Sequence, residues 1–87
     1  GAAAVLVTSG AYARAHGLPV LARIRSKASP GCAPEGMGIG PVEASRKALA
    51  RAGLAIGDID IVELNEAFSS QSLAVIGELG IDTERVN

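Results

Sequence analysis

Between residues 59 and 68 the chain reads Ile59-Asp60-Ile61-Val62-Glu63-Leu64-Asn65-Glu66-Ala67-Phe68. The short apolar run predicts a strand over residues 59–64, and the residues after it predict a helix over 66–79 that ends at Gly80. An Asn at such a strand-to-helix turn can direct its amide into a cleft at the carboxyl edge of the sheet, where open α/β sheets bind ligands. Asn65 is therefore the first candidate catalytic residue.

The helix predicted over residues 66–79 is unusual because it has no charged residue between Ala67 and Gly77. Apolar and small residues occur on every side of it, and a helix of this kind is buried on every side. A chain of 87 residues is too short to surround such a helix. We therefore expect layers on both sides of it, supplied by polypeptide outside this chain.

The other segments predict an alternation of strands and helices. Strands are predicted over residues 2–8 and 19–26, a short helix after the N-cap Ser9, a loop over 29–40, and a helix over 41–52. Gly17 and Gly53 are predicted to end the two helices. On the longer helix, Glu43 and Lys47 are expected to pair on the face away from the sheet. This order predicts an α/β fold with a largely parallel sheet.

Composition and charge argue against several classes of protein. Apolar residues make up 48% of the chain, the formal net charge is −1, and no basic stripe occurs, so we expect no nucleic-acid partner. No apolar stretch reaches the roughly 20 residues of a membrane span, so we expect no membrane partner. Cys32 is the only cysteine, which excludes an internal disulfide and a cysteine metal cluster and fits a reducing cytoplasm.

Asn65 and Glu66 each allow two interpretations. The Asn65 amide can donate to a substrate oxygen or hold a water that does so, and Asn is also a good N-cap of a helix. Glu66 can act as an acid or base, although a carboxylate in the first helical turn is favoured by the helix dipole alone.

Three features of the preceding segments also remain open. The glycines between Gly36 and Gly40 run into a helix N-terminus, so they either cradle an anion or allow close packing. Met37 within this loop is either a core residue or a pocket wall. Cys32 could act as a nucleophile beside His16, but nothing in their spacing places the two together.

Several segments occur in a characteristic order: Gly1-Ala2-Ala3-Ala4-Val5-Leu6-Val7, Pro19-Val20-Leu21-Ala22-Arg23-Ile24, Met37-Gly38-Ile39-Gly40-Pro41-Val42, Arg46-Lys47-Ala48-Leu49-Ala50-Arg51-Ala52-Gly53 and the stretch ending at Phe68. In this order and register they resemble the thiolase family over essentially the whole chain. Residues 1–18 resemble the end of the family's N-terminal half, and residues 19–87 the first part of its C-terminal domain. The implied fold is a layered α/β/α/β/α arrangement, only part of which is present.

The resemblance implies an acyltransferase of fatty acid metabolism that forms or cleaves 3-ketoacyl-coenzyme A by Claisen chemistry. A coenzyme A thioester is then the substrate, no cofactor is bound covalently, and the whole enzyme is a homodimer or homotetramer. Asn65 matches the family's Asn that orients a water, which together with a histidine stabilises the enolate oxygen. Met37, Ala67 and Phe68 match residues that line the acyl and pantetheine pocket.

The chain also departs from the family pattern. The nucleophilic cysteine of the family would lie before Gly1, and its Gly-His-Pro segment and second cysteine after Asn87, while Cys32 and His16 match neither role. We therefore expect the chain to be a piece of a longer protein and to be inactive alone. The alternative function is a non-catalytic α/β module that binds a partner through its apolar helix.

Overall fold

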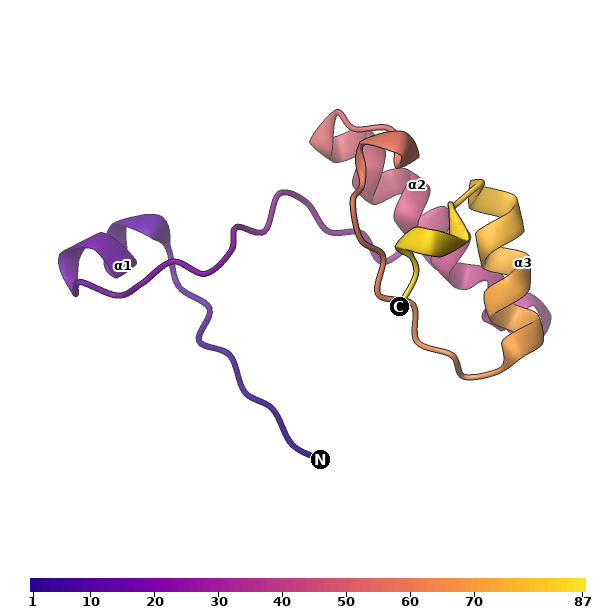
Figure 1. The fold of residues 1–87 in the computed structure, drawn as a ribbon, viewed down its shortest axis with the longest axis horizontal. Coiled ribbons are helices and arrows are strands. Elements are labelled where there is room, and N and C mark those ends of the chain that lie inside the picture. Colours follow the sequence, from indigo (N-terminus) through magenta and orange to yellow (C-terminus); the bar gives the residue numbers. More distant parts are fainter.

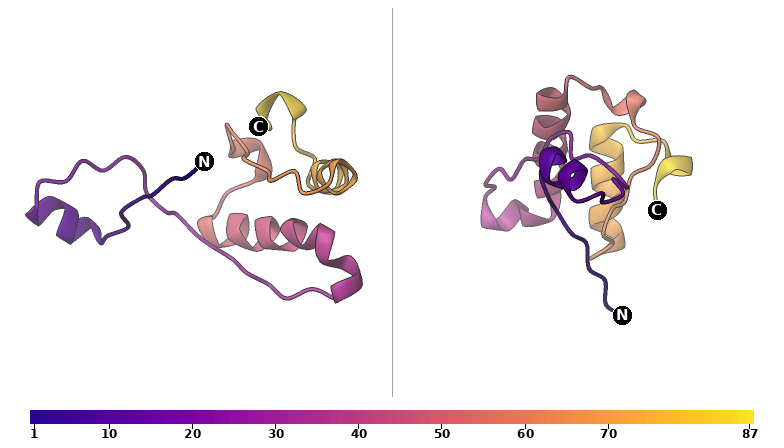
Figure 2. Two further views of the ribbon diagram at one scale, coloured as in Figure 1. Left: turned by 90° about the horizontal axis from the view of Figure 1, so that it is seen from below. Right: turned by 90° about the vertical axis from the view of Figure 1, so that its left-hand side faces the viewer.

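The computed structural model describes all 87 residues, and Figure 1 shows the course of the chain. The helices are α1 (Gly10–Ala15), α2 (Gly40–Ala52) and α3 (Ser69–Leu79), with short 3-10 helices η1 (Pro34–Ile39), η2 (Ile56–Asp58) and η3 (Thr83–Arg85). α2 and α3 lie side by side, whereas α1 and its flanking segments extend away from them (Figures 1 and 2). No helix is both long enough and apolar enough to span a bilayer.

The ends of the helices confirm most of the predicted boundaries. Ser9 caps α1, because its Oγ accepts a hydrogen bond of 3.1 Å from the Tyr12 N–H. α2 ends at Gly53 and α3 at Gly80, with φ angles of 68° and 65°. Glycine adopts this left-handed conformation without the steric cost that a Cβ imposes, so both helices stop where the sequence predicts.

The start of α3 lies three residues later than predicted. The Ala67 N–H donates to the Asn65 carbonyl at 3.1 Å, which closes a tight turn, and Phe68 is extended with φ −143° and ψ 137°. The first helical residue is consequently Ser69 rather than Glu66. The prediction missed the turn because Glu66, Ala67 and Phe68 are all compatible with a helix.

The contact between α2 and α3 forms the centre of the structure. Val42 of α2 is buried, and Val75 of α3 is only 1% exposed. At the edge of this contact Arg46 donates to Glu43 at 3.0 Å and to the Glu78 carbonyl of α3 at 3.2 Å. The predicted Glu43–Lys47 pair is therefore wrong, because Glu43 pairs with Arg46, which also reaches α3.

α3 is covered on one side only. Val75 is buried, while Leu73 on another side of the helix is 69% exposed. The helix therefore packs well along a single stripe, and its remaining apolar surface has no neighbour within these 87 residues.

None of the three predicted strands forms as an extended strand, and only the third segment has a backbone partner, through one isolated bridge between Val62 and Val86. Val62 donates to the Arg85 carbonyl at 2.7 Å, Asn87 donates to the Val62 carbonyl at 2.9 Å, and Leu64 donates to the Asn87 carbonyl at 3.1 Å. This pairing is parallel, but it is a single bridge and not the largely parallel sheet that the sequence predicts. The predicted strands over 2–8 and 19–26 are not formed, since a strand exists only through hydrogen bonds to a neighbour, and their apolar side chains are exposed.

Ser72 is a weak point of the α2–α3 contact. Its Oγ is buried and has no hydrogen-bond partner. We expect Ser72→Ala to raise the free energy of unfolding by about 1 kcal/mol, because it removes an unpaired buried hydroxyl and introduces a better helix former. Urea unfolding followed by far-ultraviolet circular dichroism measures this, with the exposed Ser70→Ala as the control, for which a change below about 0.5 kcal/mol is expected. A loss of stability in Ser72→Ala would mean that the hydroxyl is in fact bonded.

Candidate functional site

Asn65 lies where the paired segment ends. The preceding residue, Leu64, still donates its N–H to Asn87, and the chain then turns through Ala67. The Asn65 side chain is exposed and makes no hydrogen bond within the chain. Since Phe68 is the N-cap residue of α3, the interpretation of Asn65 as the N-cap is wrong. Its amide is therefore available to an external partner.

Glu66 does not occupy the first turn of α3. That turn contains no acidic residue, because the helix begins at Ser69. The explanation of Glu66 by the helix dipole is therefore wrong, and its exposed carboxylate forms no ion pair within the chain.

The glycine-rich loop folds into the 3-10 helix η1 and packs against the start of α3. A Cβ built on Gly38 would lie 3.4 Å from Cγ of Gln71, and one on Gly40 would lie 3.4 Å from the Cys32 Sγ. These contacts favour close packing as the reason for the glycines. They also place η1 at the end of the α2–α3 pair where both helices begin (Figure 1).

The predicted pocket residues occur at this same end of the molecule. Met37 lies on η1 beside Gly38, and Ala67 and Phe68 directly precede α3. Met37 and Phe68 are each 74% exposed within these 87 residues. Met37 and Phe68 thus present exposed apolar side chains on η1 and just before α3.

Cys32 and His16 are not brought together. His16 stacks on Tyr12 with ring centroids 4.0 Å apart, and its Nδ1 lies 3.0 Å from the Tyr12 carbonyl. His16 and Tyr12 belong to the α1 region, which lies apart from the α2–α3 pair (Figure 2). Cys32 instead lies beside the start of α2, where its Sγ is 3.4 Å from a Cβ built on Gly40. No group of three or more His, Cys, Asp and Glu side chains has the arrangement of a metal site.

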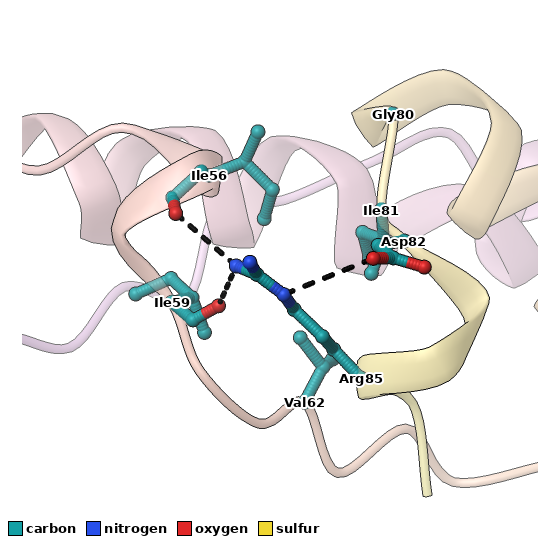
Figure 3. A pocket seen from close by; sticks show the side chains of 8 residues that line it. Ile56, Ile59, Val62, Gly80, Ile81, Asp82 and Arg85 are labelled. Carbon is teal, nitrogen blue, oxygen red and sulfur yellow. Dashed lines mark hydrogen bonds and ion pairs between the residues drawn. The ribbon is translucent and has the colours of Figure 1, made fainter.

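Two hollows lie away from these residues. One is a cavity of ≈ 190 Å³ between η2, η3 and the paired segment, shown in Figure 3. The other is an open groove of ≈ 490 Å³ along α2, lined largely by apolar residues. Neither hollow is lined by Asn65, Met37, Ala67 or Phe68. The roles of these four residues stay predictions.

Arg85 lines the smaller cavity, and nothing in the sequence pattern points to it. Its guanidinium Nη1 donates to the carbonyls of Gly57 at 3.2 Å and Ile59 at 2.9 Å, and its Nε lies 3.9 Å from Asp82 Oδ2. The sequence could not predict these contacts of Arg85, because the residue belongs to no motif and its partners are backbone carbonyls more than 25 residues away.

Comparison with known proteins covers the whole chain. Residues 18–87 match the family model described as "Thiolase, C-terminal domain". All of the chain aligns at 61% identity with 22% of an acetyl-CoA acetyltransferase from Pseudomonas aeruginosa, and at 53% identity with 23% of a 3-ketoacyl-CoA thiolase from Shewanella denitrificans. The chain thus spans less than a quarter of the length of these relatives.

Solved structures match equally well. Human mitochondrial 3-ketoacyl-CoA thiolase superimposes with a TM-score of 0.86 at 45% identity, over 90% of this chain and 20% of that one. The acetyl-CoA acetyltransferase of Bacillus anthracis gives 0.86 at 46% identity, over 91% of this chain and 20% of that one. The predicted fold class is confirmed, and the chain follows the course of about one fifth of that fold. The domain division between residues 18 and 19 stays a prediction.

Proposed function

The chain belongs to the thiolase family, whose C-terminal domain it matches over residues 18–87, and from this we propose that it forms part of the acyl-coenzyme A site of an acyltransferase. The observation that carries this proposal is the 61% identity to an acetyl-CoA acetyltransferase across all 87 residues. The proposed reaction forms or cleaves a 3-ketoacyl-coenzyme A by Claisen chemistry. Coenzyme A thioesters are then substrates, and the site uses no covalently bound cofactor.

Asn65 is proposed to supply a hydrogen-bond donor to this site. Its amide has no partner within the chain, and the pairing of Leu64 with Asn87 holds the backbone just before it. A donor held in place and free of other bonds can orient a water toward an oxygen on which negative charge develops. Donors of this kind are among the largest single contributions to acyl-transfer catalysis.

Met37, Ala67 and Phe68 are proposed to form the wall along which the acyl and pantetheine portions lie. Their support is that all three are exposed at the end of the molecule where α2 and α3 begin. Apolar walls with a few polar groups are typical of pockets for small molecules. The nucleophilic cysteine and the activating histidine are proposed to come from polypeptide outside residues 1–87, because Cys32 and His16 match neither role in the family pattern and lie apart from each other.

A segment exchange tests the proposal. Residues 1–87 replace the aligned segment of the Pseudomonas aeruginosa acetyl-CoA acetyltransferase, and we call the product the chimera. We expect the chimera to cleave acetoacetyl-coenzyme A with a kcat within about tenfold of the unmodified enzyme, which corresponds to a barrier change of about 1.4 kcal/mol. The chain alone should show no turnover. A folded but inactive chimera, or turnover by the chain alone, would contradict the proposal.

The assembly of the whole enzyme is proposed from the same family membership, and its location from the single cysteine, which fits a reducing compartment. We propose a homodimer or homotetramer in the cytoplasm. Light scattering of the chimera measures its molar mass, and a monomer would contradict the proposed assembly.

A further inference from the structure

Arg85 contacts the segment that leads to Asn65 at three points. Its guanidinium donates to the carbonyls of Gly57 and Ile59 (Figure 3), and its own backbone carbonyl accepts the Val62 N–H at 2.7 Å. Hydrogen bonds from a charged donor are stronger than those between neutral groups. One residue thus holds the chain from position 57 to position 62.

The register of this segment depends on few other contacts. The parallel pairing consists of three backbone hydrogen bonds, at Val62 and Leu64 on one side and at Arg85 and Asn87 on the other. A slip by one residue in such a pair moves every side chain to the opposite face. In the observed register Val62 lines the cavity and Ile61 is exposed. A slip would reverse this and would displace Asn65 by one residue.

We propose that Arg85 is a positioning residue, which sets the register of residues 59–64 beside 85–87 and thereby the place of the Asn65 amide. This inference rests on the role of Asn65 proposed above. The ion pair with Asp82 is not what matters, because both side chains are about half exposed and the separation is 3.9 Å. The hydrogen bonds to the Gly57 and Ile59 carbonyls instead fix the backbone of the segment before Asn65.

A double-mutant cycle in the chimera tests this inference. Arg85→Met keeps an unbranched apolar stem and removes the donors, and we expect it to lower kcat about tenfold with little change in KM, because small misplacement of a catalytic group costs rate. In the Asn65→Ala background the same change should alter kcat less than about twofold, since the positioned amide is already absent. Arg85→Lys should recover part of kcat, because an ammonium can still donate to a carbonyl.

The outcomes separate the two proposals. If Asn65→Ala leaves kcat intact, the role of Asn65 fails and the inference on Arg85 fails with it. If Asn65→Ala lowers kcat but Arg85→Met either has no effect or causes the same fold-loss in both backgrounds, only the inference on Arg85 is overturned. Lys47→Met, which removes an exposed cation without an ion-pair partner, should leave kcat unchanged. If Arg85→Met does not fold, the cycle is run with Arg85→Lys and the same criterion.

Discussion

Asn65→Ala in the chimera is expected to lower kcat for cleavage of acetoacetyl-coenzyme A by roughly 10²–10³, the effect of losing one donor to a developing oxyanion. The reason lies in the geometry around Asn65. Its side chain makes no hydrogen bond within the chain, so its removal leaves no internal group unpaired and does not unfold the segment. The loss should appear in kcat rather than in KM, because the donor acts mainly in the transition state.

Two further variants sharpen this test. Asn65→Asp keeps the shape of the side chain but removes its N–H donors, so we expect a kcat loss close to that of Asn65→Ala. Lys47→Met serves as the control on an exposed position of α2. Steady-state kinetics of all three at equal folded concentration decides the question. A rise in KM with kcat unchanged would show that Asn65 binds substrate without stabilising the transition state.

Leu73→Ala in the chimera is expected to reduce the free energy of unfolding by about 2–5 kcal/mol, the cost of removing a large side chain from a core. Within the 87-residue chain Leu73 is 69% exposed, so the same change should cost less than about 0.5 kcal/mol there. The difference is expected because α3 carries no charge from its first residue to Gly77, and a helix of this composition is buried on all sides in a layered fold.

Val75→Ala is the matched control for Leu73→Ala on the same helix. Val75 is 1% exposed within the chain, so this substitution should destabilise both the chain and the chimera. Urea unfolding followed by circular dichroism compares the four proteins. A neutral Leu73→Ala in the chimera would mean that no second layer covers α3, and the layered prediction would be wrong.

The predicted helices were largely correct because their signals are local. Ser9 bonds to an N–H three residues away, and Gly53 and Gly80 adopt a conformation that other residues disfavour, so each boundary depends on its immediate neighbours. The start of α3 was wrong for the complementary reason. Residues 66–68 have no side chain that forbids a helix, and the turn closed by Asn65 and Ala67 is not encoded by any single residue.

For the candidate site too, some features could be predicted from the sequence and others could not. The family resemblance singled out Asn65, Met37, Ala67 and Phe68 by residue type and order, and those properties are present in the chain whatever its conformation. The pairing of residues 62–64 with 85–87 and the packing of η1 on α3 could not be predicted in this way.

Residue chemistry and local geometry therefore determined the helices, most of their ends, the stretch of α3 without charge up to Gly77, and the membership of a family. Only the tertiary structure decided which side of α3 is covered, which predicted strand obtains a partner, and that Arg85 binds carbonyls 26 and 28 residues away. The physical reason is that a contact between distant residues requires the intervening chain to close a loop and depends on where other elements lie. The identity of one residue in such a contact therefore does not predict which distant residue is its partner.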